Sequence, residues 1–150
     1  MIRLLASVLS GLLLAGSAAS AMPANRQEQV QFRKGETGTT LKGRIKGDQI
    51  VDYRLRAAAG QSIVVAFRPS NPSAYFNVIA PGADSALFVG STSGNEFSAE
   101  LPTDGVYTLR VYLMRHAARR NETADYALQV RVVGQADKTV GPHRSREAAQ

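Results

Sequence analysis

From Gln29 to Val133, short runs of β-branched and aromatic residues alternate with breaks made of Gly, Pro, Asn and Asp. Strands at such regular spacing are typical of a β-sandwich or a β-barrel. The runs that predict strands are residues 29–33, 39–46, 50–57, 62–68, 74–80, 86–90, 96–101, 106–113 and 124–133. The pattern therefore predicts one all-β domain over residues 29–133, an antiparallel β-sandwich of about eight or nine strands.

Alternation of apolar and polar residues within several runs predicts which face of each strand is buried. The inward positions predicted in this way are Tyr53, Leu55, Phe76, Leu109, Val111, Leu128 and Val130. Residues 62–67 are apolar on both faces, which favours a central strand. The Tyr-x-Leu-x-Val pattern shared by residues 107–111 and 126–130 is interpreted as two neighbouring strands that fill the same core layer.

The first 21 residues have the layout of a secretory signal peptide. Arg3 precedes an apolar run over residues 4–15, and small residues then end in Ala19-Ser20-Ala21. Signal peptidase cuts at such an A-x-A pattern, and the apolar run is well short of the roughly 20 residues that a membrane-spanning helix needs. We therefore expect residues 1–21 to be removed at the motif formed by Ala19 and Ala21, and the product to be periplasmic or secreted.

Two polar segments flank the predicted domain. Residues 22–28 are predicted to be a flexible lead-in, and residues 134–150, which are polar and carry both signs of charge, a disordered tail. The chain has a formal net charge of +6 and contains no cysteine. A basic surface attracts acidic partners, and export makes nucleic acid the least suitable of these. Without cysteine for disulfides or lipidation, we expect a domain that is stable through its core alone and has no stable membrane anchor.

The sequence offers little catalytic chemistry. Its two histidines, His116 and His143, stand in a basic segment and in the polar tail, whereas a zinc site needs three or four ligands at compatible spacing. Neither a G-x-S-x-G nucleophile motif nor a glycine-rich phosphate loop occurs. We therefore expect a protein that is not an enzyme and that binds no cofactor or metal.

Residues 114–123 form a basic segment that is longer than a hairpin between two predicted strands requires. Its basic residues are Arg115, His116, Arg119 and Arg120. If residues 115–120 form a helical turn, Arg115 and Arg119 lie at positions i and i+4 and project on the same side. Two guanidinium groups placed in this way can bind carboxylates or phosphates. The alternative is a solvated loop, which is the commoner role of a charge run. Its arginines would then pair with Glu122, Asp125 or Asp104.

Short motifs are spread over the whole predicted domain. They are Phe-Arg-Lys-Gly at 32–35, Ile-Lys-Gly at 45–47, Leu-Pro-x-x-Gly-x-Tyr-x-Leu-Arg-Val at 101–111 and Arg-x-x-Ala-Arg-x-Asn-x-Thr at 115–123. Over residues 30–132 the sequence resembles the exported bacterial inhibitors of g-type (goose-type) lysozyme. The motif at 105–111 is also similar to the β-sandwich appended to secreted peptidases, whereas the motif at 115–123 is more specific.

The resemblance implies a small β-sandwich that blocks a g-type lysozyme by placing loops in the substrate groove, with loop arginines near the catalytic carboxylates. The matching positions are Arg115 and Arg119, and we expect Arg120 and His116 beside them to contribute less. From composition alone these residues would remain a solvated loop.

Two positions depart from the family pattern. The Ser-Gly turn of the family is Asp104-Gly105 here, and we include both residues among the expected lysozyme contacts. An aromatic residue after the Lys-Gly pair is replaced by Asp48. An acidic side chain that faces an acidic groove is unfavourable for binding.

The predicted partner is therefore a g-type lysozyme, and the predicted function is its inhibition by a basic loop. The main alternative is a non-catalytic β-sandwich that binds an anionic polysaccharide or another cell-envelope component through the same loop. An accessory domain separated from a secreted peptidase is a third interpretation, and the oligomeric state stays open.

Overall fold

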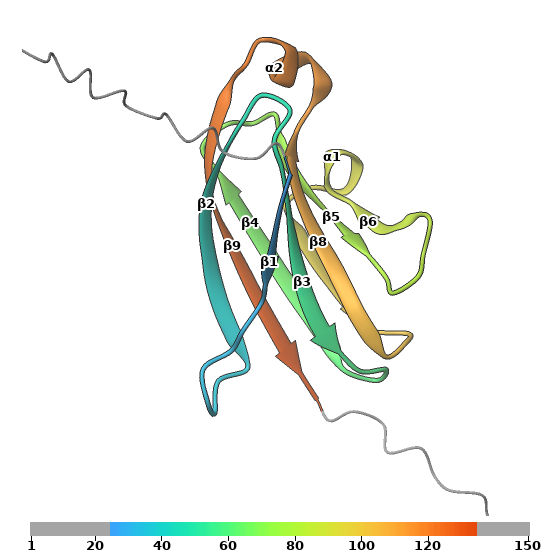
Figure 1. Ribbon diagram of the computed structural model, residues 1–150. Helices are drawn as coiled ribbons and strands as arrows, with labels where there is room; N and C mark the ends of the chain where they lie inside the picture. Colours follow the sequence, from blue (N-terminus) through green and yellow to red (C-terminus); the bar gives the residue numbers. More distant parts are fainter. Residues whose placement is uncertain (1–24, 135–150) are drawn as a thin grey trace, which may run out of the picture.

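The computed structural model describes residues 25–134 and shows two β-sheets packed face to face (Figure 1). In spatial order, sheet A contains β1 (Asn25–Gln29), β3 (Ile50–Ala57), β8 (Gly105–Leu113), β5 (Ala74–Ile79) and β6 (Ala86–Val89). Sheet B contains β2 (Gly38–Lys46), β9 (Thr123–Val133), β4 (Ser62–Pro69) and β7 (Glu96–Glu100). Two short helices, α1 (Gly90–Ser93) and α2 (Arg115–Arg119), connect strands. The predicted all-β sandwich is confirmed.

From residue 38 onward, each predicted strand is present with both ends within one residue of the prediction. The agreement follows from the residues at the breaks, because proline and glycine rarely continue a hydrogen-bonded ladder. All strand pairs but one are antiparallel, as predicted. No helix within residues 25–134 is long and apolar enough to cross a membrane.

The prediction for the first strand was wrong. The strand was expected at residues 29–33 after a flexible lead-in, but residues 25–28 of that lead-in form most of β1, which pairs in parallel with β3. The pairing uses backbone groups at the open edge of β3, so the polar sequence of β1 gives no periodic signal. Val30 and Phe32, which suggested the strand, instead lie beyond it and pack against the core while partly buried.

The remaining predictions for the chain ends lie outside the described residues. They concern the signal peptide over residues 1–21, the start of the lead-in at residues 22–24, and the tail beyond Gly134.

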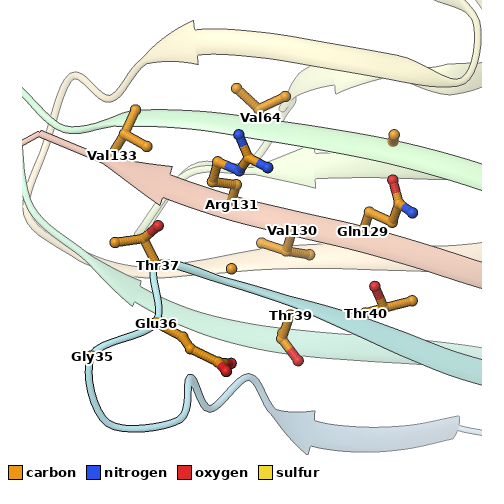
Figure 2. A pocket seen from close by; sticks show the side chains of 12 residues that line it. Gly35, Glu36, Thr37, Thr39, Thr40, Val64, Gln129, Val130, Arg131 and Val133 are labelled. Atoms are coloured by element: carbon orange, nitrogen blue, oxygen red, sulfur yellow. The ribbon is translucent and has the colours of Figure 1, made fainter.

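The strand β4 occupies an interior position between β9 and β7, as predicted, but only one of its faces is buried. Ile63, Val65 and Phe67 point into the core, whereas 41% of the surface of Val64 is exposed. Val64 lines a shallow hollow on the outer face of sheet B, beside Arg131 (Figure 2). The apolar residues on both faces of this strand therefore indicate its interior position in the sheet and not burial of both faces.

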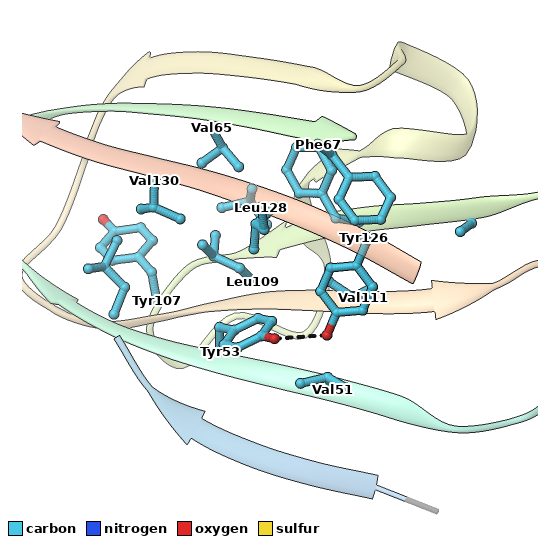
Figure 3. Close-up of a cluster of buried hydrophobic side chains, with 14 of the residues drawn as sticks. Val51, Tyr53, Val65, Phe67, Tyr107, Leu109, Val111, Tyr126, Leu128 and Val130 are labelled. Atoms are coloured by element: carbon cyan, nitrogen blue, oxygen red, sulfur yellow. Dashed lines mark hydrogen bonds between the residues drawn. The ribbon is translucent and has the colours of Figure 1, made fainter. Parts of the chain in front are cut away.

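The inward side chains of both sheets meet in one continuous core (Figure 3). The seven positions predicted to point inward are all buried, with at most 2% of their surface exposed. The repeated Tyr-x-Leu-x-Val segments at residues 107–111 and 126–130 belong to β8 in sheet A and β9 in sheet B. They therefore face each other across the sandwich, and the prediction that they are neighbouring strands was wrong.

One polar interaction spans this core. The hydroxyl groups of Tyr53 and Tyr126 lie 2.8 Å apart, which joins the two sheets by a hydrogen bond. Burial raises the pKa of Tyr53 and also that of Tyr126, so both phenols stay neutral at ordinary pH.

Candidate functional site

The residues expected to contact lysozyme lie at opposite ends of the sandwich. Asp104 and Gly105 are at the start of β8, whereas the basic segment follows the other end of this strand (Figure 1). The ends of this strand of nine residues are eight steps of about 3.3 Å apart, a separation of roughly 26 Å. The structure therefore does not bring these residues together in one site.

At the β8 start, the polar groups are used within the chain. The Asp104 Oδ1 atom accepts a hydrogen bond of 2.8 Å from the backbone N–H of Ala59, in the turn between β3 and β4. Gly105 has a φ of +139°, and a Cβ atom there would lie 2.8 Å from the ring of Pro81. The Tyr107 hydroxyl donates to the backbone oxygen of Thr103 at 2.7 Å. These contacts support a role in shaping the turn.

At the opposite end, three connections form one surface, which we call the loop end. It consists of the β2–β3 turn (residues 47–49), the β4–β5 connection (residues 70–73) and the part of the basic segment that precedes β9 (residues 114–122). The Gly47 N–H donates to the Glu122 backbone oxygen at 2.9 Å, and the Met114 N–H donates to the Ser73 backbone oxygen at 2.9 Å. The basic segment is therefore bonded to both other connections.

The basic segment contains the helical turn on which the sequence argument depended. Its helix, α2, spans Arg115–Arg119, and Ala117 is completely buried while its basic neighbours are exposed. Burial of Ala117 fixes which side of this turn faces the sandwich. Arg115 and Arg119 stand at positions i and i+4 and so project on the same side of the turn.

Arg120 belongs to a local ion-pair network. Its guanidinium group pairs with the carboxylate of Glu122, with Nε 2.8 Å from Oε1. The other carboxylate oxygen accepts a hydrogen bond of 2.9 Å from the side-chain amide of Asn71. The hydrogen bond from Asn71, followed by the one from Arg120, lowers the pKa of Glu122. For Arg120, the structure matches the alternative in which a basic side chain pairs within its own loop.

Arg115 and Arg119 differ from Arg120. Within residues 25–134, neither side chain forms an ion pair or a hydrogen bond. Three carboxylates were considered as partners for them, and each is used or placed elsewhere. Glu122 binds Arg120, and Asp125 binds Arg44. Asp104 lies at the start of β8, at the opposite end of the sandwich. The Arg44–Asp125 contact is bidentate, with N–O distances of 2.6 and 3.0 Å. The two helix arginines therefore present free donors to an external carboxylate or phosphate.

His116 and Asp48 also belong to the loop end. The His116 Nε2 atom lies 3.1 Å from the Ser73 hydroxyl, which ties α2 to the β4–β5 connection. Asp48 is exposed in the β2–β3 turn, next to Gly47. Gly47 has a φ of +60°, and a Cβ atom there would approach the Asn121 side chain to 2.7 Å. An acidic side chain is thus held close to the basic segment.

The β4–β5 connection is the part of this surface that the sequence did not indicate. Its Ser70, Asn71 and Ser73 look like ordinary turn residues, and their partners lie more than 40 residues away in the chain. A shallow depression beside them is lined by Phe67, Arg68, Pro69, Ser70, Asn95, Asp125, Tyr126 and Ala127.

The larger hollow on sheet B offers no comparable chemistry. Threonine, valine and glycine dominate its lining, with Arg131 and Glu36 as its charged residues (Figure 2). Over the part of the chain that the structure describes, no group of three or more His, Asp or Glu residues could hold a metal ion.

A relative of known sequence and several solved structures belong to the same family of inhibitors. No protein-family model matches the chain. The chain is 32% identical over 124 residues to the inhibitor of g-type lysozyme of Escherichia coli (strain K12), which covers 81% of this chain and 92% of that protein. The crystal structure of PliG from Aeromonas hydrophila, a periplasmic inhibitor of g-type lysozyme, has 34% identity and a TM-score of 0.67 over 73% of this chain and 97% of that chain. PliG from Salmonella Typhimurium, also a periplasmic inhibitor of g-type lysozyme, has 26% identity and a TM-score of 0.59 over 72% of this chain and 98% of that chain.

Proposed function

Because this chain belongs to the family of inhibitors of g-type lysozyme, we propose that it is a non-catalytic, exported protein that binds and inhibits such an enzyme. The solved relatives are described as periplasmic. The signal-peptide pattern over residues 1–21 supports the same location for this chain.

The observation that carries the proposed mode of action is the unpaired state of Arg115 and Arg119 among the described residues. Glycoside hydrolases such as lysozymes use carboxyl groups on either side of the bond that they cleave. Two guanidinium groups on one side of α2 can pair with such carboxylates and at the same time occupy the space of the substrate. The inhibitor would thereby exclude substrate and neutralise the groups that act on it.

Other basic residues of the segment have smaller proposed roles. Arg120 is already paired with Glu122, so a contact with lysozyme would compete with that ion pair. The His116 Nε2 atom is already hydrogen-bonded to the Ser73 hydroxyl, so it is less free to contact lysozyme. Asp104 and Gly105 are left out of the proposed interface because they stand at the far end of β8.

An inhibition assay tests the proposed function. Purified residues 22–150 are added to a g-type lysozyme and, as a control for selectivity, to a c-type lysozyme. We expect inhibition of the g-type enzyme and little effect on the c-type enzyme. Failure to inhibit any g-type enzyme, together with retention on isolated cell-wall material without lysozyme, would instead favour the anionic-polymer alternative.

A further inference from the structure

We propose that Asn71 is a positioning residue for Arg115 and Arg119, although it lies outside the basic segment. The inference rests on the proposed function, since it concerns how these two arginines are presented to lysozyme. Asn71 is in the β4–β5 connection, which the sequence did not connect with binding.

The Asn71 side chain joins two connections of the loop end through both of its polar atoms. Its Nδ2 atom donates to Glu122 Oε2 at 2.9 Å and to the backbone oxygen of Thr123 at 3.3 Å. Its Oδ1 atom accepts a hydrogen bond of 2.9 Å from the backbone N–H of Ser73. One amide group therefore holds the return of the basic segment against the β4–β5 connection.

Glu122 transmits this restraint to α2. Its backbone N–H donates to the oxygen of Ala117 inside the helix at 3.1 Å, and its backbone oxygen accepts from Gly47 at 2.9 Å. Its side chain pairs with Arg120, the residue that directly follows the helix. A shift of Glu122 would therefore alter the C-terminal end of α2, which carries Arg119.

The helix needs such external restraints. It has five residues, and Met114 at its N-cap makes no side-chain capping bond. Helices this short are not stable by themselves, because the first turn costs more conformational entropy than it returns in hydrogen bonds. Burial of Ala117 fixes one side of α2, and the Asn71–Glu122 contact fixes its end. A loop that is ordered before association loses less entropy on binding.

The substitution Asn71→Asp tests the contact with little change in shape. The introduced carboxylate would still accept the bond from Ser73, but it would place one of its oxygens against the carboxylate of Glu122. Two like charges at this distance repel each other. We expect the affinity for the g-type lysozyme to fall about tenfold, which corresponds to about 1.4 kcal/mol. The melting temperature should change by only a few degrees because the contact is at the surface.

A second variant separates positioning from general damage. When Asn71→Asp is combined with Glu122→Gln, the introduced glutamine amide can donate to the introduced aspartate, so the hydrogen bond returns with its direction reversed. We expect the double variant to bind nearly as well as Glu122→Gln alone. If Asn71→Asp weakens binding by the same factor in the Glu122→Gln background as in the wild type, the inference is overturned, because independent effects add and coupled ones do not.

Asn77→Asp is the matched control. Asn77 is on β5 in sheet A, and its Oδ1 atom accepts from Gly90 N–H and the Tyr112 hydroxyl at 3.3 and 3.2 Å, bonds that an aspartate would keep. If Asn71→Asp binds like Asn77→Asp while Arg115→Ala weakens binding, only the positioning role is refuted. If Arg115→Ala and Arg119→Ala also bind like the wild type, the proposed site itself is wrong.

Discussion

The two ends of the sandwich differ in how their charged residues are used. At the start of β8, the Asp104 carboxylate is bonded to a backbone N–H, and Gly105 fits closely against Pro81. At the loop end, Arg120 is paired with Glu122, but Arg115 and Arg119 have no polar partner among residues 25–134. A polar side chain that its own chain leaves without a partner can bind another molecule without first breaking an internal bond.

The comparison shows why charge in the sequence is a weak guide to binding. The basic segment contains three arginines, yet the structure assigns one of them to its own loop and leaves two exposed without partners. At the far end, Asp104, which departs from the family pattern, and Gly105, which keeps it, both take part in a local turn. Substitutions at the two ends should therefore separate stability from inhibition.

The largest effect is expected in the core between the two ends. Leu128 is completely buried on β9, and truncation to alanine leaves a cavity in close-packed surroundings. Leu128→Ala should lower the free energy of unfolding by about 2–5 kcal/mol. Denaturant titration measures this loss, and inhibition by the remaining folded protein should be unchanged. A loss below about 1 kcal/mol would contradict the assigned packing.

At the β8 start, Gly105→Ala should reduce stability without changing inhibition. The added methyl group would meet Pro81 at 2.8 Å, on a backbone with a φ of +139°. Such strain costs of order 1–3 kcal/mol. Gly82→Ala is the control, because Gly82 also has a positive φ but its Cβ position is open, so the loss should be smaller. Weaker inhibition by folded Gly105→Ala would mean that the β8 start does contact lysozyme.

At the loop end, Arg115→Ala and Arg119→Ala should have the reverse effect. Each should weaken inhibition of a g-type lysozyme at least tenfold, or about 1.4 kcal/mol, because a carboxylate in the enzyme groove would lose its partner. Stability should change by no more than about 0.5 kcal/mol, since both side chains are exposed.

Arg131→Ala provides the charge-matched control for both arginine variants. Arg131 is also exposed, but on the outer face of sheet B, so its removal changes the net charge equally without altering α2. Equal losses of inhibition in all three variants would mean that overall charge, and not the placement of α2, controls binding.

Much of the fold could be predicted because its signals are local. Period-two alternation identified Tyr53, Leu109 and Leu128 as inward positions, and turn residues fixed the strand ends. The strand β1 could not be predicted in this way, since backbone groups of the polar residues 25–29 pair with β3 whatever their side chains.

The candidate site was predicted in part. The i, i+4 spacing anticipated the helical turn with Arg115 and Arg119. The distance between Asp104 and the basic segment follows from the predicted strand over residues 106–113, which lies between them in the sequence and places them at opposite ends of the sheet. The role of Asn71 had no sequence signal, because its partner Glu122 is 51 positions away and the contact forms only when both loops fold.

The smallest expected effect concerns the pH dependence of the loop end. Hydrogen bonds from Asn71 and Arg120 hold the pKa of Glu122 below its ordinary value of 4.5. A carboxyl group whose pKa is lowered on folding stabilises the folded state above that ordinary value and loses this contribution as the pH falls through the lowered pKa.

We therefore expect the basic segment to loosen only below about pH 4.5 and to stay unchanged between pH 6 and pH 8. Amide hydrogen exchange of residues 115–122 at stepped pH measures this loosening. In Glu122→Gln, which has no carboxyl group to titrate at this position, the acid-induced step should disappear, while exchange at the β8 start stays as in the wild type. An unchanged step in Glu122→Gln would mean that another carboxylate controls the segment. Asp125 would be the first candidate, because it is near in sequence and its bond to Arg44 also lowers its pKa.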